Sequence, residues 1–460
     1  MTFLINVVMT VANTLLILLE GLVSAIRLLL KGIGALFGFG GTWKSRLATV
    51  LLAPSSQRLV FTVLRAFIPN LVLSTSVVKA YENSGTAVIS RNDDVKEVLN
   101  RDADFEVVYG PRMEKITAGK NFFLGMQDTP EYTRDTSNMR IAIRRDDVPN
   151  IVVPMANKQA EAIVVGCKGR LDLPQDLTLQ IPAKMVSEYF GTPGPKAPGS
   201  PTSRDMMEWT TLMFWYLFID LAADPQLDSK TLDAASKCRS YLDAAIAERK
   251  ANPTETDDVL NRCLEMQKAQ IPGMDDLGIR NYLIGFLIGA IPTISKASTQ
   301  IMDVLLDRPD ALAKAQAAAR TDDHEMLDAV IFEAFRFNPI NPVIYRRATR
   351  DARIADGTLR ARTIPKGSLV FAANFSAMFD RLKIQSPNEF RTNRPWEDYI
   401  LWGYGMHTCS GAWINRAIIP TLLAPLLKQK NLRRAPGDAG QIDTAGTPFP
   451  VHMHLEFDPA

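Results

Sequence analysis

A short loop near the C-terminus, in which glycines flank a single cysteine, constrains the fold more than any other feature of this chain. Residues 402–411 read Trp-Gly-Tyr-Gly-Met-His-Thr-Cys-Ser-Gly, and a helix-forming run follows from Ala412 to Lys430. Glycine permits positive φ and lets backbone amides approach a sulfur atom closely, and the positive end of the following helix favours a thiolate. The loop therefore predicts that Cys409 is an anionic ligand, although a lone cysteine is more often a buried free thiol.

The residues around Cys409 decide between these two interpretations. They match the pattern aromatic-x-x-Gly-x-His-x-Cys-x-Gly and resemble the haem loop of the cytochrome P450 family, with Trp402 where the family usually has phenylalanine. The resemblance implies haem b, iron protoporphyrin IX, with the Cys409 thiolate as the axial iron ligand. It also implies that Gly405, His407 and Gly411 lie against the cofactor, with His407 as a candidate partner of a haem propionate.

Two further segments match the same family in the expected order along the chain. Residues 332–339 contain the pair Glu333 and Arg336, whose opposite charges can meet one turn apart on a helix, and residues 387–394 resemble the family's meander. The resemblance implies that Arg394 completes a buried charge network with that pair. Removing one partner from such a network costs about 3–5 kcal/mol, so substitution of Glu333 or Arg336 is expected to lose haem and fold together.

Arg346 resembles the family's strand contact to a haem propionate, because a guanidinium can bind a carboxylate through two hydrogen bonds. An ordinary arginine at a strand edge is an equally good interpretation. Residues 128–134 resemble the family's entry to another helix that touches the cofactor, but Tyr132 replaces the usual histidine. Arg134 and Arg140 are weak substitutes for a propionate contact on that side.

A long apolar helix is predicted from Asp276 to Leu306, and its centre resembles the oxygen-activating helix of the family. The resemblance implies that Gly289 leaves room for a ligand beside the iron and that the Thr293 hydroxyl donates to bound dioxygen and relays protons. Pro292 replaces the family's usual acid and is expected to kink the helix. A peroxide-dependent peroxygenase or a fatty-acid hydroperoxide isomerase is therefore an alternative to a monooxygenase. Lys296, one turn further on, can simply point to solvent.

Helical periodicity dominates the body of the chain from Ser203 onward, and short strand-like segments occur near residues 71–90, 354–372 and 451–457. The expected fold class is mainly α with a minor β-sheet component, a cytochrome P450-like fold. No internal repeat, low-complexity tract or long linker divides the body. Residues 49–460 are therefore predicted to form one haem-thiolate catalytic domain.

The N-terminal segment is apolar enough to interact with a membrane. No charge lies between Phe3 and Leu19, and about 20 apolar residues suffice to cross a bilayer. Residues 1–30 are predicted to span the membrane, with residues 31–48 as a glycine-rich tether. Because the cations lie at the end of the segment or beyond it, the catalytic domain is placed on the cytoplasmic side. An interfacial amphipathic helix and a buried N-terminal helix of a soluble cytoplasmic protein remain alternatives.

The composition argues against several other classes of protein. With 52 basic and 50 acidic side chains the formal net charge is +2, so nucleic-acid binding is disfavoured. The four cysteines form no Cys-x-x-Cys pair, so neither a disulfide framework nor a thiolate zinc site is expected, and a reducing compartment is the default. His452 and His454 could share one face of a C-terminal strand, but a chance pair is the simpler interpretation.

The resemblance implies a monooxygenase that hydroxylates or epoxidises a lipophilic substrate with dioxygen and electrons from a ferredoxin or a flavoprotein reductase. An axial thiolate favours O–O cleavage. The large apolar side chains of residues 206–218 could form an access lid, although such clusters are more often core. Two classes remain as alternatives: a non-catalytic haem-binding sensor, and a membrane-tethered helical interaction protein without haem.

Overall fold

The computed structural model describes residues 2–37, 42, 43, 46, 47, 50, 53–194 and 199–458. Helices dominate over strands in these residues, so the predicted mainly α class with a minor β-sheet is confirmed. The chain packs into two compact units. We call residues 1–106 with 341–408 the sheet unit, and residues 107–340 with 409–460 the helical unit. Residues 49–460, predicted as one catalytic domain, are therefore divided between these two units.

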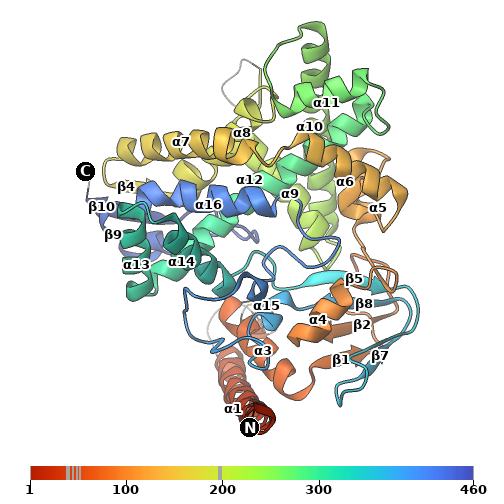
Figure 1. The fold of residues 1–460 in the computed structure, drawn as a ribbon, viewed down its shortest axis with the longest axis vertical. Coiled ribbons are helices and arrows are strands. Elements are labelled where there is room, and N and C mark those ends of the chain that lie inside the picture. The colour runs from red at the N-terminus through yellow and green to blue at the C-terminus, as the bar shows by residue number, and fades with distance from the viewer. Residues whose placement is uncertain are drawn as a thin grey trace. The chain divides into compact units, whose positions relative to one another are not determined.

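The sheet unit is built on a five-stranded sheet with the strand order β1-β2-β8-β5-β3 (Figure 1). Strands β2 and β8 are parallel, with Gly85 beside Ser368, and the other neighbours are antiparallel. Side chains such as Ala87 and Ile89 are fully buried, as expected for small and β-branched residues on a packed, pleated surface. The strands are β1 (Asn70–Leu73), β2 (Gly85–Ile89), β3 (Phe105–Glu106), β5 (Ile344–Ala348) and β8 (Ser368–Ala372), with a separate pair β6 (Ala352–Ile354) and β7 (Arg362–Ile364).

Helix α1 (Thr2–Phe37) packs along α3 (Pro54–Phe67) within the sheet unit. Its packed side carries Ile17, Ser24 and Ala35, which recur at helical spacing and are at most 7 % exposed. Gly21 lies at the closest approach, because a Cβ atom added there would lie 2.3 Å from the Cβ atom of Ala66. Further helices of this unit with described bounds are α4 (Asn92–Leu99), α15 (Asn374–Ala377) and the short η4 (Trp396–Asp398).

The predicted glycine-rich tether, residues 31–48, is wrong over its first part, because residues 31–37 continue helix α1. Contacts to α3 explain why Gly32 and Gly34 do not end the helix: the Lys31 ammonium donates to the Ser55 hydroxyl over 2.9 Å. Residues 38–41, 44, 45 and 48 of the predicted tether lie outside the described residues.

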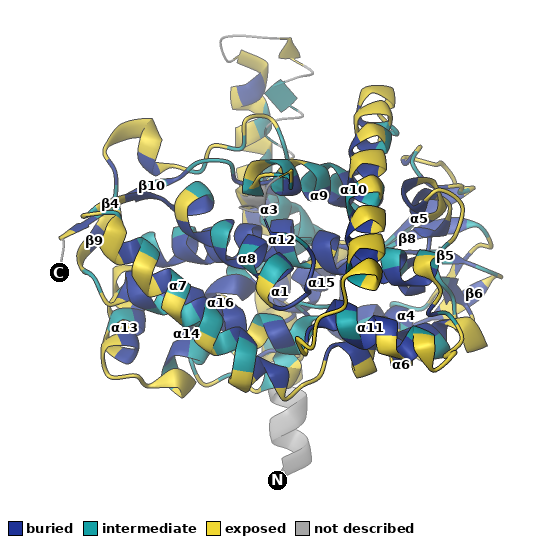
Figure 2. Ribbon diagram, turned by 90° about the horizontal axis from the view of Figure 1, so that it is seen from above, coloured by how far each residue is buried: buried dark blue, intermediate teal, exposed yellow. Residues whose placement is uncertain are grey.

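Helix α12 (Asp276–Leu306) forms the centre of the helical unit, with α9, α10 and α14 packed against it. Its bounds agree with the predicted helix, and most of its side chains are buried (Figure 2). Among the described residues it is the one helix long and apolar enough to cross a membrane, but 78 % of its most apolar window is buried. Such burial identifies α12 as the core helix of this unit.

The other elements of the helical unit surround α12. Its helices are α5 (Gly110–Thr117), α6 (Pro130–Ala142), α7 (Val153–Gly166), α8 (Gln180–Glu188), α9 (Ser203–Phe218), α10 (Pro225–Ala251), α11 (Val259–Lys268), α13 (Pro309–Arg320), α14 (His324–Phe337) and α16 (Ala412–Leu427), with the short helices η1 (Phe123–Gly125), η2 (Val148–Val152), η3 (Leu173–Thr178) and η5 (Gly437–Gly440). A small sheet of strand order β4-β10-β9 joins β4 (Arg170–Asp172), β10 (His454–Asp458) and β9 (Lys430–Arg434).

Candidate functional site

Cys409 stands in the turn immediately before α16, and its carbonyl accepts a hydrogen bond from the amide of Ala412 over 3.2 Å. The backbone amides of Gly411 and Ala412 lie at the start of this helix, close to the thiol. Burial raises the pKa of the Cys409 thiol, and the two amides lower it by a smaller amount. The helix start acts in the direction that the sequence predicts, toward the thiolate, and desolvation acts against it. The residue as a whole is exposed, and a metal ion bound to the sulfur would deprotonate it.

The glycines before Cys409 have conformational and steric reasons to be glycine. Gly403 and Gly405 have φ values of 89° and 75°, a region that other residues rarely adopt. A Cβ atom on Gly405 would lie 2.6 Å from the carbonyl oxygen of Leu99. The loop therefore needs glycine for its own backbone, and contact of Gly405 with a cofactor stays a prediction.

Arg346 and His407, the two candidate propionate partners, influence each other within the sheet unit. Arg346 is 3 % exposed on β5, and its guanidinium donates to the carbonyl of Tyr345 over 2.9 Å. Burial, together with the positive charge of Arg346, lowers the pKa of His407 to about 4. His407 is thus neutral at pH 7 and lies 3.5 Å from Asp102 Oδ1. Of the two, Arg346 carries the charge that a carboxylate would need.

Glu333 and Arg336 form the ion pair that the sequence predicts, inside the helical unit. Arg336 Nη2 and Nε lie 2.8 Å and 2.9 Å from the two carboxylate oxygens of Glu333, and both side chains are completely buried. Arg394 belongs to the sheet unit, where it donates to the carbonyls of Gln385 and Ser386 over 2.6 Å and 2.8 Å. The pair is confirmed, and a network that includes Arg394 stays a prediction.

The centre of α12 contains an opening in an otherwise buried helix. Gly289 is exposed, and a Cβ atom added there would meet nothing within 4 Å. Thr293, one turn later on the same face, donates its hydroxyl to the carbonyl of Gly289. Pro292 lies within the helix and offers no amide to the carbonyl of Ile288. The open space beside a hydroxyl fits the room for a small ligand that the sequence predicts here.

Lys296 does not point to solvent, as the sequence interpretation allowed. It is 7 % exposed, and its ammonium lies 5.1 Å from the centre of the Phe449 ring. Burial lowers the pKa of Lys296 to about 8. Phe449 belongs to the C-terminal segment, far from Lys296 in the sequence, so local patterns could not predict this contact.

A cavity of about 1430 Å³ lies beside α9 and α10 in the helical unit. Residues 206–218, predicted as lid or core, include core side chains, because Met206 and Met213 are buried, while Trp209 and Trp215 line the cavity; a lid stays a prediction. Phe449 completes its apolar wall. The cavity is large enough for a drug-sized or larger organic molecule.

The weak propionate candidates near Tyr132 are engaged elsewhere or exposed. Arg134 Nε lies 2.7 Å from Asp135 Oδ1, and Arg140 is exposed at the end of α6.

Sequence reasoning missed Asp172, which lies beside His452 and His454. Asp172 is on β4 and the histidines are at β10, and no local pattern in the sequence shows that these two strands pair.

These features fit a haem. In the helical unit, Cys409 offers a sulfur in an exposed residue, and Gly289 offers open space beside the Thr293 hydroxyl. In the sheet unit, Arg346 offers a buried cation suited to a carboxylate. Thiolate, cation and an unobstructed helix face are the groups that an iron porphyrin with one axial protein ligand requires.

Comparison with known proteins identifies the same family. A family model described as Cytochrome P450 matches residues 80–439. The C-19 steroid 1alpha-hydroxylase of Sorangium cellulosum is 26 % identical over 252 residues, which cover 54 % of this chain and 58 % of that protein. The cytochrome P450 monooxygenase PikC of Streptomyces venezuelae is 24 % identical, over 70 % of this chain and 75 % of PikC.

Solved structures share the fold at low sequence identity. CYP109E1 from Bacillus megaterium, in complex with testosterone, has a TM-score of 0.72 and 16 % identity, and the match covers 88 % of this chain and 98 % of that one.

The names of the relatives, which include hydroxylases, monooxygenases and the cyclomarin C epoxidase CymV of Salinispora arenicola, support a haem-thiolate monooxygenase. The chain therefore belongs to the cytochrome P450 family, whose cofactor is haem b with a cysteine thiolate as axial ligand.

Proposed function

We propose that this chain is a monooxygenase that inserts oxygen from dioxygen into a lipophilic substrate and takes its electrons from a redox-partner protein. The observation that carries the proposal is the opening at Gly289, beside the Thr293 hydroxyl, in the largely buried central helix α12. A haem-binding sensor would not need a hydroxyl at that place. Family membership and the helical fold also argue against an interaction protein without haem.

Different residues of the chain would have separate roles in such an enzyme. Bound haem supplies the oxidising chemistry. Cys409 would hold the iron through its sulfur, beside the backbone amides of Gly411 and Ala412, and Arg346 would bind a propionate. The Thr293 hydroxyl, which donates to the carbonyl of Gly289 in this structure, would turn to donate a hydrogen bond to a ligand bound at Gly289.

A carbon monoxide difference spectrum tests the ligand assignment directly. Reduced protein under carbon monoxide is expected to show the red-shifted Soret band of thiolate ligation, and Cys409→Ala should abolish it. Cys167→Ala, which alters a half-buried cysteine elsewhere in the helical unit, should leave the band unchanged. A normal band in Cys409→Ala would overturn the assignment.

The source of oxygen has an alternative, because Pro292 replaces the acid that most family members place before the threonine. A peroxide-dependent peroxygenase or a hydroperoxide isomerase would suit this departure, but the names of the relatives favour a monooxygenase. Product formation with dioxygen, NADPH, ferredoxin and ferredoxin reductase should be compared with product formation on hydrogen peroxide alone. Turnover on peroxide only would contradict the proposal.

The substrate is proposed to be an apolar molecule of steroid or fatty-acyl size. Among the similar proteins, one is named for a C-19 steroid and another solved structure, P450BioI, is in complex with an acyl carrier protein carrying hexadec-9Z-enoic acid. Electron-donor proteins of the ferredoxin type are the proposed partners.

We propose further that α1 lies on a membrane surface. One side of α1 is packed against α3, and Glu20 on this helix pairs with Arg381 and accepts from Asn388 over 2.9 Å. The other side exposes large apolar side chains that include Leu15, Leu22 and Leu29. A helix with one face packed on its own protein and one apolar face exposed suits the interfacial alternative better than a membrane span.

A further inference from the structure

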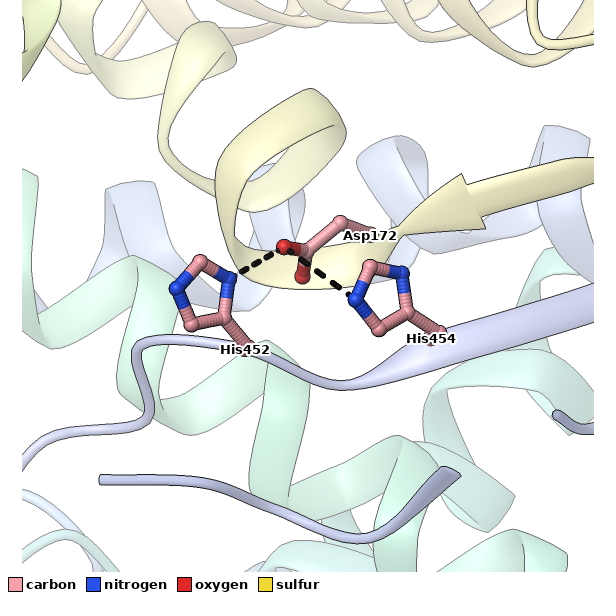
Figure 3. Close-up of side chains that lie close together, drawn as sticks. All are labelled: Asp172, His452 and His454. Carbon is pink, nitrogen blue, oxygen red and sulfur yellow. Dashed lines mark hydrogen bonds and ion pairs between the residues drawn. The ribbon is translucent and has the colours of Figure 1, made fainter. Parts of the chain in front are cut away.

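Three side chains with metal-binding atoms converge at one edge of the small sheet in the helical unit. Asp172 ends β4, and His454 begins β10 directly opposite Asp172 in the strand register. His452 lies two residues before His454, so both imidazoles share one face of the strand. Figure 3 shows both rings directed at the carboxylate of Asp172.

The distances between these groups suit a small cation. His452 Nδ1 lies 2.5 Å and His454 Nε2 4.0 Å from the same oxygen, Asp172 Oδ2. The three candidate ligand atoms all lie within 4.8 Å of one another. Ligands of tetrahedral zinc are ~3.3 Å apart, given bonds of ~2.0–2.1 Å. Small rotations of the side chains would therefore bring all three atoms to bonding distance.

The backbone around the three residues is already held in place. Asp172 Oδ1 accepts a hydrogen bond from the amide of Met453 over 3.1 Å, which orients the carboxylate and leaves Oδ2 for the imidazoles. His452 pairs with Asp443 through backbone bonds of 2.9 Å and 3.1 Å, and the carbonyl of His454 accepts from Ala435 over 3.0 Å. Such outer contacts are what fix the ligands of protein metal sites.

Accessibility allows an ion to enter this cluster. The side chains of His452 and His454 are 41 % and 34 % exposed, whereas that of Asp172 is 11 % exposed. The charge of the carboxylate is thus partly shielded from water, while the imidazoles face the solvent. Two imidazoles with one carboxylate form a ligand set typical of zinc, with a fourth position left for water.

We propose that Asp172, His452 and His454 bind one Zn²⁺ ion at a site separate from the haem iron. The ion would join the C-terminal segment to β4. The residues just before His452, namely Phe449, Pro450 and Val451, line the large cavity, and the carbonyl of Val451 accepts from Gln175 over 2.8 Å. Zinc binding would therefore stiffen one wall of that cavity and stabilise the folded chain by mass action.

Zinc binding to the tag-free, haem-loaded protein tests this site. After dialysis against micromolar Zn²⁺, elemental analysis should find one zinc per chain in addition to the haem iron. Calorimetric titration with Zn²⁺ should show an affinity that falls at least tenfold in His452→Ala and in His454→Ala. Because zinc and iron are counted separately, the result is independent of the proposed monooxygenase activity.

His324→Ala is the matched control, since His324 lies at the start of α14, outside the cluster. This variant should bind zinc as the unaltered chain does. An unchanged Soret band and melting temperature in zinc-free buffer will show that the two cluster variants are folded. X-ray absorption at the zinc edge should report only nitrogen and oxygen ligands. Zinc binding that is absent, or equally tight in the His452→Ala and His454→Ala variants, would overturn the proposal.

Discussion

Lys296 is a charge buried at a cost to stability. Burial is the one cause that shifts its pKa, from 10.5 down to about 8, and no carboxylate offsets it. Between pH 8 and pH 10.5 the unfolded chain holds more protons at this residue than the folded chain, so the free energy of unfolding should rise with pH in that window. Below pH 8 the full cost remains, on the order of 3 kcal/mol.

Lys296→Met should therefore raise the free energy of unfolding at pH 7 by about 2–3 kcal/mol, because it keeps the apolar volume and removes the ammonium. Urea unfolding at pH 7 and at pH 10 measures this, and the gain should shrink at the higher pH. Lys268→Met, at a side chain that is 69 % exposed, should change little at either pH. A loss of stability in Lys296→Met would mean that the contact with Phe449 outweighs the cost of burial.

Removing one charge of the Glu333–Arg336 pair should lower the free energy of unfolding, whereas removing the Lys296 charge should raise it. Both side chains of the pair are fully buried, and each charge compensates the other. Glu333→Gln leaves the Arg336 cation without its counter-charge and should cost about 3–5 kcal/mol. Urea midpoints and the ratio of haem to protein absorbance measure fold and cofactor together. Glu265→Gln breaks an exposed pair with Lys268 and should cost less than about 1 kcal/mol. Equal midpoints for the two variants would contradict this assignment.

At the scale of single residues, the sequence predicted the side chains whose partners lie within one turn. Glu333 with Arg336 is such a pair, and the structure brings the two together. The sequence could not predict partners that tertiary folding supplies, as Phe449 does for Lys296.

At the scale of helices, α1 and α3 approach each other closely at one point. A methyl group on Gly21 would lie 2.3 Å from Ala66 Cβ and 2.9 Å from the Phe67 ring, so the helices must separate to admit it. Gly21→Ala should therefore cost about 1–3 kcal/mol in spite of the better helix propensity of alanine. Hydrogen exchange of the amides in α1 and α3 should quicken in this variant.

Gly34→Ala is the matched control for this contact, because a Cβ atom at Gly34 meets nothing within 4 Å. Alanine there removes the entropic cost of a glycine within a helix and should stabilise α1 by about 0.8–1 kcal/mol. Exchange in α1 should slow in Gly34→Ala. If Gly21→Ala also slowed exchange, α1 would not be packed on α3 in solution.

At the scale of the whole molecule, the sequence predicted the fold class and the long central helix but not the division into units. The chain passes between the units after Glu106, Ile340 and Thr408. None of these points has a proline-rich or low-complexity linker, which is the signal that sequence reasoning needs. The sheet explains the division, because β5 and β8 pair with strands more than 200 residues earlier in the chain, and such pairing leaves no mark on local periodicity.

The position of the whole protein, in solution or on a membrane, depends on the exposed face of α1. Leu22 and Leu29 are 53 % and 64 % exposed and lie two turns apart on that face. Burying a leucine in an apolar environment contributes ~1.5–3 kcal/mol, so replacing both by lysine should weaken binding to lipid vesicles by ~100-fold or more. Co-flotation of the full-length protein with phosphatidylcholine and phosphatidylglycerol vesicles measures this.

Leu359→Lys, at a fully exposed leucine elsewhere in the sheet unit, should float as the unaltered chain does. Neither lysine would touch the packed side of α1, so a fall in flotation without a change in melting temperature would place the apolar face on the membrane. If the unaltered chain does not float either, this apolar face would instead bind another partner.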